Sequence, residues 1–199
     1  GEADSSVMAY NYRLILTRDP ANQIMLSKPA NFDPAIAKQA IGGGFVPNLP
    51  NKKVAWNGGR LIGPQNEYPA ADWPTREAIS KRYLDAMLMR LWWVQNDPEA
   101  PEKDRKQFAG YALAADEFPD NGHAPYEIYV REARRLVGRY VFKEQDNVIA
   151  EGIARTPIHA DSIAMTDWPV DSVACHAIVG VLVVRPQRDD IACHDAAAH

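Results

Sequence analysis

The stretch DWPTREAISKRYLDAMLMRLWWVQNDP, residues 72–98, carries the clearest secondary-structure signal in the chain. Its apolar side chains recur at helical spacing, at Ile79, Tyr83, Met87, Leu91 and Val94. Asp72 ahead of Pro74 is a typical helix start, and Asp97-Pro98 is a typical stop. We therefore predict an amphipathic helix of about five turns whose aromatic and methionine side chains belong to the core.

Towards the N-terminus, residues 7–17 alternate between apolar and other side chains, which predicts a strand. Residues 17–22 then carry turn-forming side chains, and residues 23–33 are expected to be extended. Asp33 before Pro34 repeats the pattern of a capped helix start, so a short helix is expected to run to about residue 41.

A run of three glycines, residues 42–44, raises the question of a phosphate-binding loop. It does not match GxGxxG, and no predicted strand precedes it with a helix after it, so a flexible loop is the better interpretation. Residues 45–72 are rich in Pro, Asn and Gly and predict a long loop anchored by Trp56 and Tyr68.

The elements expected after the long helix are a helix at 101–113, a strand at 126–130 that resumes at 136–142, a helix at 146–153, and strands at 162–167 and 177–184. Because strands and helices do not alternate regularly, the pattern favours an α+β fold with a mixed or antiparallel sheet and packed helices. We expect a single domain over residues 1–199, with a flexible C-terminal tail at 185–199.

Composition excludes several classes of partner. With 199 residues and 46% hydrophobic side chains, the chain can build a sizeable core. A net charge of -4 gives no electrostatic case for nucleic acid. No apolar run approaches the roughly 20 residues that span a bilayer, so no membrane partner is expected.

Two cysteines, Cys175 and Cys193, are each followed directly by a histidine. Adjacent residues on a strand point to opposite faces, so these pairs are poor metal chelates. We expect a disulfide between the two cysteines, or no bond, and no metal site.

The most charged stretch is DEFPDNGHAPYEIYVREARRLVG, residues 116–138. Charged side chains are seldom buried unless they are paired or meet a ligand. Functionally, forked guanidinium donors suit a carboxylate or hydroxyl-rich substrate. Structurally, the arginines would pair with nearby acids, at Asp116, Glu117, Asp120 or Glu132. The candidate substrate-binding residues are Arg131, Arg134, Arg135, Asp116 and Asp120.

His123 lies in the turn of the same stretch, close to acidic residues. Histidine exchanges a proton most easily near neutral pH, so His123 is the candidate catalytic acid or base. The alternative is an exposed loop histidine with no catalytic role.

Four segments together, TRDPAN (17–22), QNDPEAP (95–101), DEFPDN (116–121) and YVREARRLVG (129–138), resemble the FAD-dependent oxidoreductase family that includes xanthan-lyase-like proteins. The resemblance covers about residues 7–173, with the segments in the same order. It implies a two-part flavoprotein in which this chain is similar to the substrate, or cap, domain. In such a domain Arg131, Arg134 and Arg135 would be pocket-shaping or scaffold groups and not catalysts.

The resemblance also implies FAD as the cofactor of the full-length protein, with a sugar, polyol or other alcohol as substrate. The GxGxxG fingerprint is absent from this chain, so FAD is not expected in this chain alone and a flavin-binding domain is the expected partner. A surface that normally faces such a domain can also support a homo-oligomer. The alternative class is a non-catalytic carbohydrate-binding or protein-interaction module.

Overall fold

The computed structural model describes residues 6–40, 43–134 and 137–140, together with Asp146, Gly152 and Ile158. The helices and strands of this part are β1 Leu14–Thr17, β2 Gln23–Ile24, α1 Pro34–Gln39, β3 Phe45–Leu49, β4 Lys53–Trp56, α2 Trp73–Asn96, α3 Glu102–Phe108 and β5 Ala112–Ala114. Two short 3₁₀ helices, η1 Pro20–Asn22 and η2 Pro64–Asn66, lie in the connections.

The strands form one sheet in the order β2-β5-β1-β4-β3, and every neighbouring pair is antiparallel. β1 lies at the centre, where Leu14 pairs with Trp56 of β4 and Leu16 pairs with Leu113 of β5. The predicted α+β fold with an antiparallel sheet is therefore confirmed.

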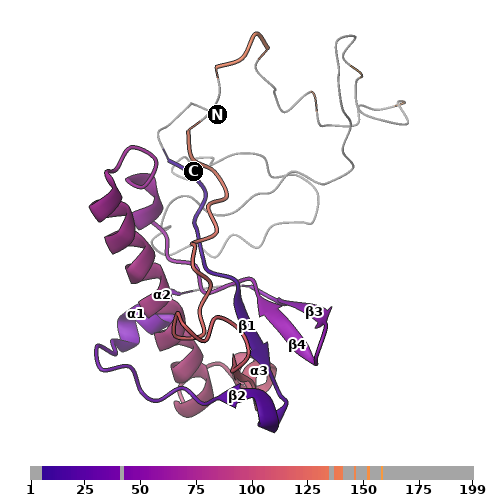
Figure 1. The fold of residues 1–199 in the computed structure, drawn as a ribbon. Helices are drawn as coiled ribbons and strands as arrows, with labels where there is room; N and C mark the ends of the chain where they lie inside the picture. Colours follow the sequence, from indigo (N-terminus) through magenta and orange to yellow (C-terminus); the bar gives the residue numbers. More distant parts are fainter. Residues whose placement is uncertain are drawn as a thin grey trace.

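The long helix α2 runs along one side of the sheet, with α1 beside it (Figure 1). Its start is capped as predicted, since the Asp72 carboxylate accepts a hydrogen bond from the Thr75 backbone N–H at 2.9 Å. The five residues of the apolar stripe are all buried: Ile79, Tyr83, Met87, Leu91 and Val94. The helix has 24 residues, which is longer than the predicted five turns. Within the described residues, no helix is both long and apolar enough to cross a membrane.

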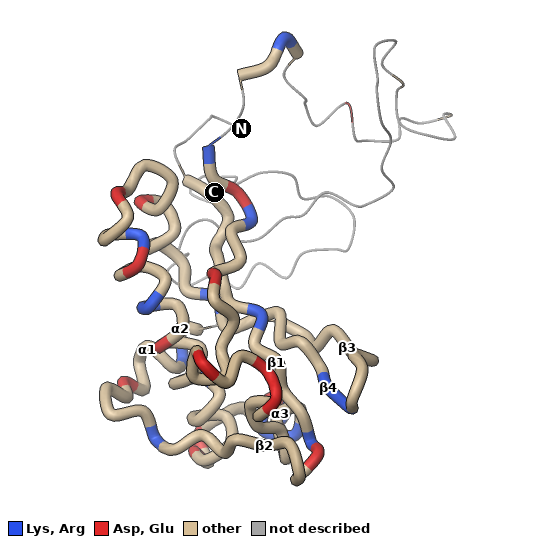
Figure 2. Tube along the Cα trace, in the orientation of Figure 1, with Lys and Arg blue, Asp and Glu red and all other residues tan. Residues whose placement is uncertain are grey.

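Positive and negative residues are interspersed along the described chain, and neither sign gathers on one element (Figure 2). The sheet and the helices share one core that contains the buried side chains of β1, β4, α2 and α3. The apolar contacts that hold the fold are therefore continuous from the sheet to the helices.

The predicted long loop at 45–72 is wrong in its first half, where β3 and β4 form a hairpin. Pro47 and Pro50 interrupt the strand pattern, because proline cannot donate a ladder hydrogen bond. The hairpin accommodates them with a register shift between Val46 and Leu49 and with left-handed backbone at Asn51 and Lys52. Trp56 is buried as expected for an anchor.

The first predicted strand is shorter than expected, because regular pairing begins only at Leu14. The preceding residues are held by side chains: the Val7 N–H donates to Asn66 Oδ1 at 3.0 Å, and Gln65 Nε2 donates to the Val7 carbonyl at 3.2 Å. Their one strand-like contact among the described residues is an isolated antiparallel bridge between Asn11 and Tyr129.

Two further elements differ from expectation. The helix predicted at 101–113 ends at Phe108, and Gly110, with a φ of 73°, turns the chain into β5. The strand predicted at 126–130 is reduced to the bridge at Tyr129. The strands expected at 162–167 and 177–184, the tail at 185–199, and both cysteines lie outside the described residues, as do residues 136, 141–142, 147–151 and 153. Residues 137–140 are described and form no strand, so the strand predicted to resume after residue 136 is absent there.

Candidate functional site

Arg131 is the predicted site residue that joins two segments far away in the sequence. Its Nη2 donates hydrogen bonds to Asn11 Oδ1 at 2.6 Å and to Asn57 Oδ1 at 2.8 Å. Asn11 is fully buried, and its Nδ2 donates to the Tyr12 carbonyl at 2.7 Å, which turns the amide oxygen towards Arg131. The two amide oxygens thus fix the position of the guanidinium.

Three segments far apart in the sequence meet at this guanidinium. Asn57 directly follows β4, and Asn11 lies three positions before the first residue of β1. The Tyr129 N–H donates to the Asn11 carbonyl at 2.8 Å, which places Arg131 two residues beyond that backbone contact. The central strands β1 and β4 therefore determine where Arg131 lies.

A second arginine shares the ring of Tyr129. The Cζ atom of Arg131 lies 4.6 Å from the ring centroid, and that of Arg13 lies 4.1 Å from it. Both distances are within the range of a cation–π contact. Among the described residues, Arg13 has no carboxylate partner, and its buried Nε has no hydrogen-bond acceptor. We call Asn11, Arg13, Asn57, Tyr129 and Arg131 the arginine cluster.

The backbone next to Arg131 is fixed by a buried tyrosine. The Tyr10 hydroxyl donates to the Glu132 carbonyl, and the Met8 N–H donates to Glu132 Oε2 at 3.3 Å. Burial, followed by the electrostatic effects of Tyr68 and Glu132, raises the pKa of Tyr10 to about 12. Tyr10 consequently remains a protonated donor at neutral pH and keeps residues 131–132 in place.

The predicted acidic partners lie elsewhere. Asp116 Oδ2 and Glu117 Oε1 each lie 2.6 Å from the ammonium of Lys53, whose side chain is only 7% exposed. Asn22 Nδ2 also donates to Asp116 Oδ1 at 2.7 Å. Asp116 and Glu117 therefore tie β4 to the segment after β5 rather than pairing with the arginines.

The hydrogen bonds around Lys53 shift the pKa values of Lys53 and Asp116. Burial by itself lowers the pKa of Lys53, but the hydrogen bonds to Asp116 and Glu117 outweigh it and raise that pKa above its ordinary value. The hydrogen bond from Lys53, followed by that from Asn22, lowers the pKa of Asp116. Both groups are thus charged across the neutral range.

His123 and Asp120 belong to a compact turn at 118–126. The Nδ1 atom of His123 lies 3.1 Å from the Glu117 carbonyl, so Nδ1 carries the proton and Nε2 is the nitrogen that can accept another. The Tyr126 hydroxyl donates to Asp120 Oδ1 at 2.5 Å. The structure brings His123 close to Glu117, but it places neither His123 nor Asp120 in contact with Arg131.

Arg134 lies at the surface, where its Nε donates to the Pro69 carbonyl at 3.0 Å, and Arg135 lies outside the described residues. The sequence reasoning missed Asn11, Arg13 and Asn57. The strand alternation at 7–17 already placed Asn11 and Arg13 on the face opposite Tyr10 and Tyr12. Two polar residues in succession on one face of an apolar segment were the available signal.

A metal ion and FAD would each need particular groups in the site. They contain no group of three His, Cys, Asp or Glu side chains that could hold a metal ion. The FAD pyrophosphate commonly binds where a glycine-rich turn leads from a strand into a helix N-terminus. Here the glycines at 43–44 lead from α1 into β3, and the Asp72 carboxylate already occupies the start of α2. These residues do not fit the pyrophosphate in that mode.

Comparison with known protein families gives one match, to the family described as FAD dependent oxidoreductase, over residues 1–192. No curated protein and no solved structure gives a significant match. The family match covers nearly the whole sequence of 199 residues and agrees with the resemblance of its four segments. The chain therefore belongs to the FAD-dependent oxidoreductase family.

Proposed function

We propose that the described residues form the substrate side of a flavoprotein oxidoreductase that acts on a sugar, a polyol or another alcohol. The observation that carries this proposal is the arginine cluster, in which Arg131 is fixed by two amide oxygens from distant segments. These two hydrogen bonds hold the guanidinium in position before any ligand binds, as a preorganised binding group requires.

Alcohol oxidation requires the substrate hydroxyl to lose a proton as its carbon loses a hydride, and bound FAD would supply the hydride acceptor. Negative charge develops on the substrate oxygen during that step. The positive charges of Arg131 and Arg13, held against the ring of Tyr129, would stabilise it. The cluster would thus bind and polarise the substrate oxygen without transferring the proton itself.

We assign the proton transfer to His123, whose Nε2 is the nitrogen available to accept a proton when Nδ1 donates to Glu117. Four further residues would shape the approach to the site: Arg134, Arg135, Asp116 and Asp120. His123 does not contact Arg131, so this part of the proposal requires the substrate to extend between the two.

We further propose that the flavin is held by a domain other than the described residues, which would act as the partner of this substrate side. The support is the poor fit of α2 and of the glycine run to a pyrophosphate. The resemblance to xanthan-lyase-like members of the family is consistent with such a two-part arrangement.

The test is an oxidation assay on the FAD-bearing enzyme with a panel of sugars, polyols, amines and thiols and an artificial electron acceptor. Turnover confined to hydroxylated compounds is expected. Turnover confined to amines or thiols would contradict the proposed substrate class. Sugar binding by a protein that never takes up FAD would favour the alternative, a non-catalytic carbohydrate-binding module.

A further inference from the structure

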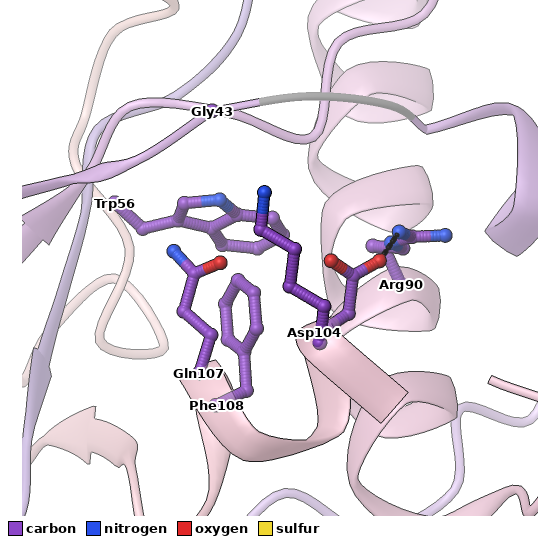
Figure 3. Close-up of a pocket in the computed structure, with 7 residues that line it drawn as sticks. Gly43, Trp56, Arg90, Asp104, Gln107 and Phe108 are labelled. Atoms are coloured by element: carbon purple, nitrogen blue, oxygen red, sulfur yellow. Dashed lines mark hydrogen bonds and ion pairs between the residues drawn. The ribbon is translucent and has the colours of Figure 1, made fainter. Parts of the chain in front are cut away.

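A polar pocket that contains none of the residues of the arginine cluster lies between α3, α2 and the end of β4 (Figure 3). Its volume is about 180 Å³. Trp56 and Phe108 form its apolar wall, and their rings meet edge to face with centroids 5.0 Å apart. Its polar side chains come mostly from α3, at Lys103, Asp104 and Gln107.

Trp56 contributes an unsatisfied donor to the pocket. The residue is only 1% exposed, and its Nε1 has no hydrogen-bond partner among the described residues. A buried N–H group without an acceptor is costly, and native structures seldom retain one without a reason. An acceptor supplied by a bound molecule would satisfy this N–H.

Asp104 supplies a fixed acceptor. Its Oδ2 lies 2.5 Å from Arg90 Nη2, while no described residue donates to its Oδ1. Arg90 is itself held, with Nη1 3.4 Å from the Ala37 carbonyl and Cζ 4.9 Å from the ring centroid of Trp93. Figure 3 shows the side chains of Asp104, Gln107 and Trp56 directed into the same space below Gly43.

The pocket therefore offers both donors and acceptors. Trp56 Nε1 and the Lys103 ammonium donate, the Asp104 carboxylate accepts, and the Gln107 amide does both. Hydroxyl groups match such a set because each donates and accepts, whereas an inorganic anion could accept from the donors but could not donate to Asp104 Oδ1. A volume of about 180 Å³ is below the range of drug-sized sites, so the ligand must be small.

We propose that this pocket binds one small polyhydroxylated molecule of the size of a monosaccharide, which donates to Asp104 and accepts from Trp56 and Lys103. The site needs neither flavin nor Arg131. It therefore goes beyond the oxidation proposed above and would hold a hydroxylated ligand away from the arginine cluster.

The test is a titration of the protein with D-glucose, glycerol and inorganic phosphate, followed by the indole N–H resonance of Trp56 in a nitrogen–proton NMR spectrum. Glucose or glycerol should shift this resonance. Gln107→Ala and Lys103→Met should each weaken binding about three- to tenfold, the effect of losing one hydrogen bond. Lys106→Met is the matched control on the same helix, because Lys106 is exposed and paired with Glu102, and it should bind as the unaltered protein does.

Three results would overturn the proposal: no shift of the Trp56 resonance with either hydroxylated compound, a shift with phosphate alone, or unchanged affinity in both pocket variants. Neither pocket variant alters a fully buried side chain, so loss of folding does not confuse the outcome. Arg131→Gln should leave glucose binding here unchanged, which separates this proposal from the proposed oxidation.

Discussion

At the scale of single residues, the described part of the chain uses its charges in two different ways. Lys53 is buried and paired with two carboxylates, whereas Arg131 Nη2 donates to the side-chain amide oxygens of Asn11 and Asn57. The first arrangement joins two parts of the sheet. The second resembles a binding group prepared in advance of its ligand, since the protein has already fixed its position.

Replacing Lys53 by Met should lower the free energy of unfolding by about 1–3 kcal/mol. The loss should be smaller than that for a fully buried pair, because Asp116 and Glu117 are 48% and 33% exposed. Urea unfolding at pH 7 measures it. Lys52→Met is the matched control, because Lys52 is 78% exposed and forms a surface pair with Asp19.

The same pair predicts a dependence on pH. Because folding lowers the pKa of Asp116, its carboxylate stabilises the fold at pH values above its unfolded pKa of about 3.9. This stabilisation is lost as the pH falls through the lowered pKa of the folded state. Because folding raises the pKa of Lys53, its ammonium stabilises the fold at pH values below its unfolded pKa of about 10.4. This stabilisation is lost as the pH rises through the raised pKa of the folded state. The stability difference between the unaltered protein and Lys53→Met should thus be constant from about pH 5 to 9 and shrink in stronger acid. A constant difference down to about pH 2 would contradict this assignment.

Gly43 connects the pocket with the arginine cluster. Its φ is 96°, and a Cβ there would lie 2.1 Å from Gly58 Cα and 2.3 Å from the Asn57 carbonyl oxygen. Gly43→Ala should therefore displace the segment that carries Asn57 and destabilise the fold by about 1–3 kcal/mol. Gly44→Ala is the control, because no atom lies within 4 Å of a Cβ at that position. Equal melting temperatures of the two variants would show that the close packing at Gly43 does not contribute to stability.

At the scale of elements, α2 joins the helices to the sheet. Met87 is fully buried, and its Sδ lies 3.2 Å from the Tyr12 N–H just before β1. Met87→Ala should cost about 2–5 kcal/mol, because it removes buried apolar atoms and leaves a cavity. Denaturant unfolding measures the loss, with the exposed Arg82→Ala as the comparison. A loss below about 0.5 kcal/mol for Met87→Ala would be inconsistent with tight packing of α2 on the sheet.

The elements also show what a sequence can reveal. α1 and α2 were predictable because Asp33-Pro34 and Asp72 are local signals of a helix start. The β3–β4 hairpin was not, because Pro47 and Pro50 hide its alternation. The candidate site was predictable only in part: Arg131 stood out by its charge, but its partners Asn11 and Asn57 are 120 and 74 positions away. Long-range pairing of that kind leaves no local pattern.

At the scale of the whole molecule, family membership and fold both bear on where the flavin binds. The chain belongs to an FAD-dependent family, yet the antiparallel sheet and helices of the described residues do not provide the strand–glycine turn–helix cradle of a dinucleotide. Family and fold agree if, as we propose, the described residues bind the substrate and another domain binds the flavin.

The most direct test is the rate of flavin reduction in the FAD-bearing enzyme, followed anaerobically at about 450 nm, where flavins absorb, against the concentration of an alcohol substrate. Arg131→Gln should raise the half-saturating substrate concentration at least about tenfold, as expected for losing a charge-assisted hydrogen bond, with flavin content unchanged. Arg105→Gln, at an exposed position on α3, should match the unaltered enzyme. An unchanged half-saturating concentration in Arg131→Gln, accompanied only by lower thermal stability, would contradict the account and leave Arg131 a structural residue.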